Sequence, residues 1–390
     1  MADGGYEYRE RQTPDMGQQT FRFGEGRISA YSACTLGVLS LLAVLCYRFP
    51  EYLTTPDLRA AYDGETLRVV LRVAMWASLG FAGLAFVLGR AQRHLAAIGV
   101  LFTVAAFALG GYEVQVGEVA PVGLSLGVDW LILALLMSVV LFTFLEKIVP
   151  KYREQAILRP EWQLDLVYFA FNHLLLSVLL LAGNYFTTTV FSWAVSDGLQ
   201  AALRALPIAV QLLVLISCAD FVLYWSHRTF HEVPFLWKIH AVHHSVEYMD
   251  WLAGSRNHVV QTFVDRCLAM VPLYLLGPDK AALDVYVTFA GLQAVLVHSN
   301  VGIPFGPLKY VFATPQYHHW HHSSEAPAID TNYAVHLPLY DMLFRTYHMP
   351  QDHWPADYGT TKRLPRSFFA QLLYPFQRDA EEDPAPAPRA

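Results

Sequence analysis

Residues 240–245, His-Ala-Val-His-His-Ser, and residues 318–323, His-His-Trp-His-His-Ser, are two near-copies of one hexapeptide, H-x-x-H-H-S. A third histidine pair, His227 and His231, precedes the first copy. Residues three and four apart share one face of an α-helix, so we expect each set to present its imidazoles in one direction. Neutral imidazole is a good ligand for a transition metal and a poor filler for an apolar core. The pattern therefore predicts helices that surround a metal centre.

The number of histidines in these sets indicates more than one metal ion. Structural zinc takes about four protein ligands and catalytic zinc about three, fewer than the sets supply. Two metal ions in a shared pocket fit the number better, and a polynuclear centre points to redox chemistry. The predicted ligands are His227, His231, His240, His243, His244, His318, His321 and His322.

Two further histidines are candidate ligands. His298 follows the last apolar stretch, from which it can reach the same pocket, and His258 stands at the start of the stretch 259–276. His319 points about 100° away from His318 by helical geometry. We therefore expect a structural or supporting role for His319 rather than a metal bond.

Four other residues are expected to support the ligands. A metal-bound imidazole usually donates its second N–H to an acceptor that fixes its tautomer. Asp220 and Tyr224 lie on one helical stripe with the first histidine pair, and an ionisable residue within an apolar span indicates function. The alternative for Asp220 is a carboxylate that pairs with a neighbouring helix. Asp330 and Asn332 are further candidates.

The composition predicts a membrane protein. Of the 390 residues, 54% are hydrophobic and only 15% are charged, compared with about 25% charged in an average protein. The net charge of −6, with no basic run, argues against nucleic-acid binding. The four cysteines form no C-x-x-C pair, so they predict neither a disulfide framework nor an iron–sulfur cluster.

Apolar stretches predict an all-α, polytopic membrane protein with about eight transmembrane helices and a histidine-rich helical cap on the cytoplasmic side. The loop 111–125 has no Lys or Arg, whereas the segments on the other side of the spans carry them. The positive-inside rule then places both termini and all histidine sets in the cytoplasm, at the inner or plasma membrane if the source is bacterial. The candidate spans are residues 29–47, 69–89, 94–110, 126–145, 164–185, 205–226, 259–276 and 281–297.

The same features predict the domain organisation. No apolar signal sequence precedes the first span, and the acidic, Pro/Ala-rich end predicts a disordered tail. The expected parts are a polar segment 1–28, a four-helix membrane region 29–145, a cytoplasmic linker 146–163, a catalytic domain 164–355 and a C-terminal segment 356–390.

Several motifs occur in a recognisable order over about residues 160–355. They are Asp220, Tyr224-Trp225-Ser226-His227-Arg228, His231, Leu236-Trp237-Lys238-Ile239-His240, Arg256-x-His258, His298-Ser299-Asn300, Thr314-Pro315-x-x-His318 and Asp330-x-Asn332-Tyr333. This series resembles the membrane-bound fatty acid hydroxylase / sterol desaturase superfamily, in its bacterial sterol-desaturase-like branch, which includes enzymes similar to alkylglycerol monooxygenase.

The resemblance implies a helical transmembrane scaffold under a cytoplasmic cap that holds two histidine-bound irons. It also implies that the irons activate O2 to hydroxylate or desaturate an unactivated C–H bond of a lipid. The eight histidines of the three sets carry over as iron ligands. The chain departs from the family at Val259 and Gln261, where Pro and Glu are frequent, and at Arg345, where Gly is usual.

The predicted function is therefore that of a non-haem diiron lipid hydroxylase or desaturase, in which zinc could replace iron on overexpression. The sequence has no fused haem domain and no G-x-G-x-x-G fingerprint, so we expect a separate reductase with a ferredoxin or cytochrome to supply electrons. Two alternatives stay open, a membrane zinc-dependent hydrolase and a histidine-rich metal transporter. The H-E-x-x-H motif frequent in zinc hydrolases does not occur.

Overall fold

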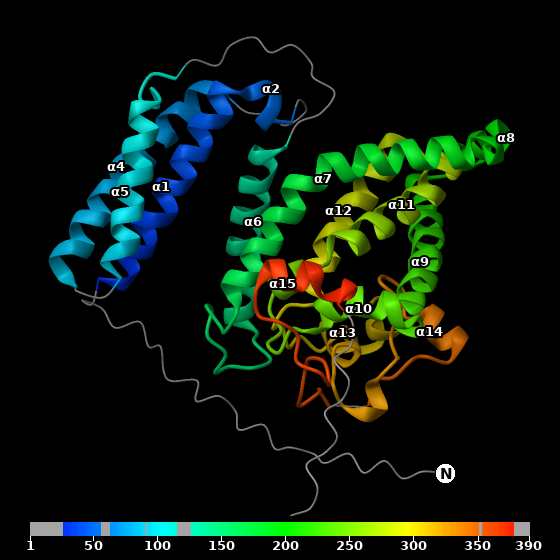
Figure 1. The fold of residues 1–390 in the computed structure, drawn as a ribbon. Coiled ribbons are helices and arrows are strands. Elements are labelled where there is room, and N and C mark those ends of the chain that lie inside the picture. Colours follow the sequence, from blue (N-terminus) through cyan, green and yellow to red (C-terminus); the bar gives the residue numbers. More distant parts are fainter. Residues whose placement is uncertain (1–25, 56–62, 90–91, 115–125, 351–352, 378–390) are drawn as a thin grey trace, which may run out of the picture. The chain divides into compact units, whose positions relative to one another are not determined.

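The computed structural model describes residues 26–55, 63–89, 92–114, 126–350 and 353–377. Within these ranges the regular structure is helical and no strand forms, which confirms the all-α prediction. The chain divides into two compact units (Figure 1): unit 1 comprises Met1–Glu51 and Pro56–Pro121, and unit 2 comprises Tyr52–Thr55 and Val122–Ala390.

Unit 1 is a bundle of three helices, α1 (Arg27–Arg48), α4 (Gly64–Leu88) and α5 (Arg93–Ala108). Small residues let α1 and α5 approach closely, since a Cβ atom added at Gly99 would lie 2.5 Å from the carbonyl oxygen of Ala33. The Ser78 hydroxyl of α4 donates to that same carbonyl. Close backbone contact and one shared polar group therefore join the three helices.

Five long helices form the scaffold of unit 2. They are α6 (Val128–Ile148), α7 (Trp162–Phe191), α9 (Ile208–Glu232), α11 (Val259–Leu276) and α12 (Lys280–Leu296). Helix α11 packs against both α7 and α9, and α12 packs against α9. The short α8 (Asp197–Arg204) and the 3-10 turn η1 (Ser192–Ala194) connect α7 to α9 at one end of unit 2 (Figure 1).

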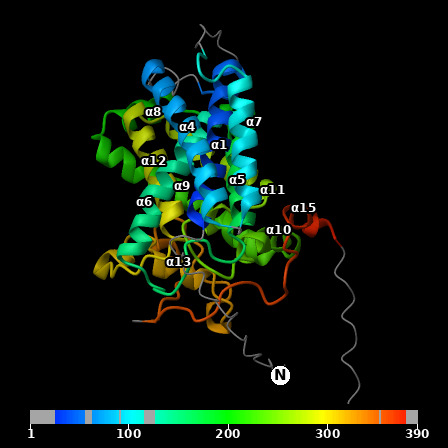
Figure 2. The same ribbon diagram turned by 90° about the vertical axis from the view of Figure 1, so that its left-hand side faces the viewer.

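Shorter helices gather at the opposite end of unit 2 (Figures 1 and 2). Proline at the first helical position begins both α10 and α13, and the hydroxyl of Thr314 caps α13 by accepting the Tyr317 N–H. The helices are α10 (Pro234–His244), α13 (Pro315–His321), α14 (Leu339–Phe344) and α15 (Phe368–Leu373). The remaining short elements are α2 (Pro50–Leu53), η2 (Ala253–Ser255), η3 (Gly306–Tyr310), η4 (Ala326–Ala328) and η5 (Tyr374–Phe376).

Five described helices are long and apolar enough to cross a membrane, which supports an integral membrane protein. A sixth span results if the two parts of α7, which meet at 49°, are counted as one. A helix covers each of the eight predicted spans, but α5 and α12 have only 16 and 17 residues. The number eight and the cytoplasmic cap remain predictions. The five helices are Ile28–Arg48, Gly64–Leu88, Val128–Ile148, Ile208–Glu232 and Val259–Leu276.

The division into units differs from the predicted grouping of residues 29–145. Helix α6 belongs to unit 2, where Leu131 and Phe142 pack with Phe169 of α7 and with Trp251. An apolar helix carries no sign in its own sequence of which neighbour it contacts. Most of the polar segment 1–28 and the predicted tail, residues 379–390, lie outside the described ranges.

Candidate metal centre

Nine of the ten predicted ligands come together at the end of unit 2 that carries α10 and α13, in two groups. The nitrogen atoms available as ligands lie within 4.8 Å of one another in each group. Cluster 1 consists of His227, His231, His240, His244 and His321. Cluster 2 consists of His243, His298, His318 and His322.

Each hexapeptide contributes to both clusters. In α10, His240 and His244 enter cluster 1 and His243 enters cluster 2. At α13 the contributions are reversed, because His318 and His322 enter cluster 2 and His321 enters cluster 1. The expectation that each set points in one direction is therefore wrong. Residues four apart share a cluster, and the residue three positions from the first is turned toward the other cluster.

The remaining ligands come from the long helices. The last two turns of α9 supply His227 and His231 to cluster 1, and His298 follows the end of α12 and completes cluster 2. The two clusters adjoin each other, since the rings of His244 and His322 stack with their centroids 4.5 Å apart. Four segments, of which only α9 and α10 are adjacent in the sequence, thus build one compact histidine centre.

The ring nitrogens Nε2 face one another inside each cluster. In cluster 1 the Nε2 atoms of His227 and His240 are 3.0 Å apart. In cluster 2 those of His243 and His298 are 3.2 Å apart, and those of His298 and His318 are 2.9 Å apart. Two nitrogen ligands bound at right angles about 2.1 Å from one ion would themselves be about 3.0 Å apart. The spacing of the nitrogens therefore fits ligands of a common metal ion.

Hydrogen bonds at Nδ1 fix the tautomers of these imidazoles. Nδ1 of His227 donates to the Tyr333 carbonyl, and that of His240 donates to the side-chain oxygen of Gln261. In cluster 2 the acceptors are also oxygens, the Arg256 carbonyl for His243 and the Ala294 carbonyl for His298. Because an oxygen of this kind only accepts, Nδ1 carries the hydrogen and Nε2 keeps its lone pair.

One pair of opposed lone pairs therefore exists in each cluster: His227 with His240, and His243 with His298. Burial lowers the pKa of His298 to about 4 and the pKa values of His240 and His243 well below the usual value, so these rings are neutral at pH 7. Two lone pairs about 3 Å apart repel unless a cation lies between them. The donor set fits two metal ions, one per cluster.

The two other histidines near the centre have different partners. His258 caps α11, since its Nδ1 accepts the Val260 N–H while its Nε2 donates to the Leu372 carbonyl. The structure therefore does not bring this predicted ligand to either cluster. His319 is fully buried beside cluster 2, with its Nδ1 against the Tyr358 hydroxyl and its Nε2 donating to the Ser299 carbonyl.

Asp220 and Tyr224 stabilise the polypeptide around the centre rather than the imidazole nitrogens themselves. The Asp220 carboxylate accepts the backbone N–H groups of residues 335–337. Tyr224 shares a hydrogen bond with the Thr346 hydroxyl and packs edge-on against the ring of Tyr333. The Tyr333 carbonyl is the acceptor for His227 of cluster 1. Tyr224 therefore affects the position of this ligand indirectly, through Tyr333.

Asp330 and Asn332 lie in the loop after η4. Asp330 contacts a ligand directly, with its carboxylate 3.2 Å from Nδ1 of His231. Asn332 holds the loop, because its side-chain amide donates to the carbonyls of Tyr317 and His348. Both residues have a positive φ of 59°, a conformation that Asn and Asp tolerate better than most residues. The turn directs the Tyr333 carbonyl toward the centre.

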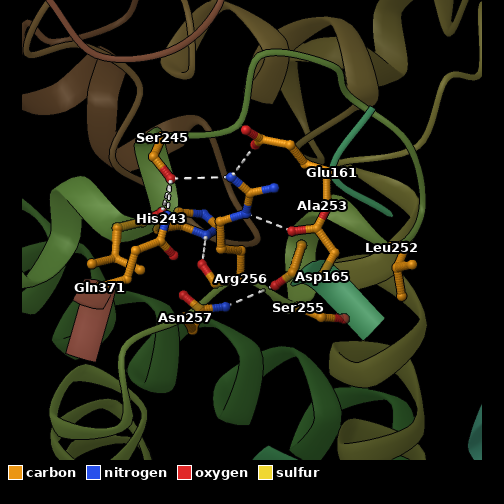
Figure 3. A network of polar contacts seen from close by, with 12 residues as sticks. Glu161, Asp165, His243, Ser245, Leu252, Ala253, Ser255, Arg256, Asn257 and Gln371 are labelled. Atoms are coloured by element: carbon orange, nitrogen blue, oxygen red, sulfur yellow. Dashed lines mark hydrogen bonds and ion pairs between the residues drawn. The ribbon is translucent and has the colours of Figure 1, made fainter. Parts of the chain in front are cut away.

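A buried ion network fixes the carbonyl that holds His243 (Figure 3). The Arg256 guanidinium binds Asp165 of α7, contacts Glu161 at 3.0 Å and donates to the Ser245 hydroxyl. Its backbone carbonyl accepts the Nδ1–H of His243 at 3.1 Å. The network therefore connects the start of α7 to the loop before α11 and sets the position of one acceptor.

Asp330, which contacts Nδ1 of His231, was a predicted supporting residue, but the other acceptors of the Nδ1 hydrogens were not predicted from the sequence. Backbone carbonyls leave no trace in side-chain identity, so those of Tyr333 and Arg256 could not have been found. Gln261 stands out in the sequence as a departure from the family and not as the partner of His240. Gln261 stands three residues after His258, where the family often carries a carboxylate. This is the one feature of the sequence that could have indicated a hydrogen-bond acceptor there.

The comparisons with known proteins agree with this centre. Residues 212–346 match the family model described as fatty acid hydroxylase. This segment is thus a fatty acid hydroxylase domain, and the predicted resemblance is confirmed. It contains the ligands from α9 to α13 and the loop of Asp330 and Asn332.

The chain matches only part of the length of each relative whose activity is known. An ornithine lipid hydroxylase of Rhizobium tropici is 37% identical over 180 residues, which are 45% of this chain and 54% of the relative. An alkylglycerol monooxygenase of Danio rerio is 35% identical over 142 residues, 36% of this chain and 31% of the relative. A very-long-chain aldehyde decarbonylase of Oryza sativa is 26% identical over 40% of this chain and 24% of its own. The chain thus spans about half or less of these relatives. No solved structure matches it.

Proposed function

We propose that the protein is a membrane-bound, non-haem diiron oxygenase that hydroxylates or desaturates an unactivated C–H bond of a lipid. The observation that supports this most strongly is the pair of opposed imidazole lone pairs in each of two adjoining clusters. The fatty acid hydroxylase domain and relatives that hydroxylate lipids support the substrate class.

When bound, two irons would supply an oxidant derived from O2 that is strong enough for an aliphatic C–H bond, which no side chain provides. The residues of the chain do the rest. The two clusters would hold one iron each, and the carbonyls of Tyr333, Arg256 and Ala294 would keep three of the imidazoles as Nε2 donors. Burial of the cluster 2 histidines would exclude water from the reaction.

The lipid would approach from the side of α9 and α10. At the ends of these helices, large apolar side chains are exposed close to cluster 1, among them Trp225 and Phe235. Trp237 of α10 contacts the ring of His231 at a centroid distance of 5.0 Å. An apolar chain in the bilayer could therefore reach the centre along this surface.

The proposal includes a location and a partner. Both termini and the clusters would face the cytoplasm, at the inner or plasma membrane if the source is bacterial, following the distribution of Lys and Arg. A separate reductase with a ferredoxin or cytochrome would supply the electrons.

Two measurements test the proposal together. Purified protein should contain about two irons per chain, and lipids from cells that express the gene should gain one oxygen atom, or lose two hydrogens, in an O2-dependent manner. One zinc per chain with no change in lipid mass would indicate the hydrolase instead. A weakly held metal that exchanges across the membrane would indicate the transporter.

A further inference from the structure

The acceptor for His240 differs in kind from the acceptors for four other ligands. Nδ1 of His240 donates to the side-chain oxygen of Gln261 at 2.8 Å. Among the described residues, His227, His243, His298 and His321 donate instead to backbone carbonyls. A carbonyl of the main chain cannot turn, whereas a glutamine amide can present either its oxygen or its NH2 group. The tautomer of His240 therefore depends on what orients Gln261.

Asp265, one helical turn further along α11, orients that amide. The Gln261 NH2 group donates to one carboxylate oxygen of Asp265 at 3.3 Å. The other carboxylate oxygen accepts the hydroxyl of Ser226 on α9 at 2.9 Å. Because a carboxylate accepts and does not donate, the NH2 group of Gln261 faces Asp265 and its oxygen faces His240.

The three contacts form one chain of hydrogen bonds across two membrane-spanning helices. It runs from Ser226 on α9 to Asp265 and Gln261 on α11, and ends at His240 on α10. Ser226 directly precedes His227, whose Nε2 faces that of His240 at 3.0 Å. The chain thus begins beside one member of the opposed pair and ends at the other.

We propose that Gln261 and Asp265 are positioning residues for cluster 1, with Asp265 holding the Gln261 amide so that His240 keeps its Nε2 lone pair directed at a metal ion. This inference rests on the proposed metal centre. Without Gln261 and Asp265, His240 can place its hydrogen on Nε2 and donate it to His227 or His244. Its Nε2 then has no lone pair for a metal ion.

The first experiment replaces Gln261→Leu and measures iron release to an excess of a bipyridine chelator. Loss of a partner of a ligating histidine typically weakens metal binding about 10- to 100-fold. We expect release from one of the two ions to become faster by a factor in that range, while the other ion is released as in the wild type.

Gln293→Leu is the matched control. Gln293 is also a buried glutamine whose side-chain oxygen accepts an imidazole Nδ1–H, that of His336 at 2.6 Å. His336 belongs to neither cluster, so this variant loses the same kind of contact without touching a ligand. Its iron release should equal that of the wild type.

The second experiment exchanges the amide and the carboxylate between positions 261 and 265. Gln261→Glu alone places two carboxylates in contact and should weaken iron binding, since like charges this close repel. Adding Asp265→Asn restores every contact and reverses the direction of only one, the hydrogen bond between positions 261 and 265. The carboxylate introduced at position 261 would accept from His240 and from the new amide at position 265, whose oxygen would accept from Ser226. We expect the double variant to release iron at nearly the wild-type rate.

The outcomes separate this inference from the proposed function. Wild-type protein that binds no iron contradicts the metal centre itself. Wild-type protein with two irons, together with a Gln261→Leu variant whose release is unchanged, overturns only the positioning role. If Gln261→Leu does not fold, the comparison of Gln261→Glu with the double variant decides, and a double variant no better than the single one refutes the role of Asp265.

Discussion

Cluster 1 and cluster 2 use the same kind of ligand but hold it in different ways. All four cluster 2 histidines are buried, and the acceptors for His243 and His298 are carbonyls of the main chain. In cluster 1, His227 and His321 also donate to main-chain carbonyls, but two further acceptors are the side chains of Gln261 and Asp330. Cluster 2 is therefore fixed by the fold, whereas cluster 1 depends on side chains that single substitutions can alter.

Each hexapeptide supplies ligands to both clusters, and this makes the clusters interdependent. Because α10 and α13 each supply both clusters, a shift of either helix moves ligands of both ions. Binding of one ion should therefore help to order the other site. Adjacent residues such as His243 and His244 nevertheless belong to different clusters, which allows each site to be disturbed by itself.

The largest effect is expected from the neighbouring substitutions His243→Ala and His244→Ala. Each removes a buried ligand, the first from cluster 2 and the second from cluster 1. Both should lower lipid turnover more than about 100-fold, and each should lose iron first from its own site, as metal analysis and Mössbauer spectra of the remaining iron would reveal.

His94→Ala is the control for this pair, because His94 lies on α5 in unit 1. Turnover and iron content should not change. Full iron content in either cluster variant, with normal turnover, would contradict the ligand assignment.

The sequence predicted which histidines share a helical face, but it did not predict how the helices cross one another. The motif spacing identified eight of the nine histidines that meet, because i,i+4 pairs lie on one helical face whatever surrounds the helix, and the position of His298 after the last apolar stretch indicated the ninth. It failed to separate His243 from His240 and His244, because which ion an imidazole reaches depends on how α9, α12 and α13 cross α10. That crossing is a property of tertiary packing and has no local signal.

A smaller effect, confined to cluster 2, is expected from Gly254→Ala. A Cβ atom at this position would lie 2.7 Å from Nδ1 of His298, closer than van der Waals contact permits. The ring would have to move from the Ala294 carbonyl that holds it. We expect about a 10- to 100-fold faster release of the cluster 2 iron, measured by chelator competition.

Gly291→Ala serves as the matched control, since a Cβ atom there meets nothing within 4 Å apart from the backbone of its own helix and its two chain neighbours. This variant should behave as the wild type. A Gly254→Ala protein that retains both irons as tightly as the Gly291→Ala protein would show that cluster 2 tolerates displacement of His298.

His319→Ala should affect stability more than metal binding. It removes the buried partner of the Ser299 carbonyl and the Tyr358 hydroxyl beside cluster 2. The Tyr358 hydroxyl keeps its hydrogen bond with Tyr152, but leaving the Ser299 carbonyl unsatisfied costs about 1–3 kcal/mol, so the unfolding temperature in detergent should fall. Iron content per folded chain should stay near the wild-type value, and loss of one iron would instead place His319 among the ligands.

His258 is a ligand that the family motif predicted and that the structure does not bring to the centre. The Arg-x-His pattern indicated a ligand, but His258 is the N-cap of α11 and its ring nitrogens already have partners. A capping histidine and a ligating histidine look alike in sequence. The Arg256 carbonyl of the same motif does reach the centre, through His243.

The smallest effect is expected from Asp330→Ala, which removes a cluster 1 acceptor at the protein surface. Asp330 contacts His231 at 3.2 Å, but its side chain is 58% exposed, so water can replace the carboxylate. Release of the cluster 1 iron should quicken only about threefold, as for other exposed charge pairs. Asp284→Ala is the matched control, because this carboxylate is equally exposed at 58% and pairs with Lys280 away from both clusters. If Asp330→Ala instead weakened iron binding as much as Gly254→Ala, cluster 1 would depend on its exposed acceptor as strictly as cluster 2 depends on its backbone carbonyls, and the contrast between the two sites would not hold.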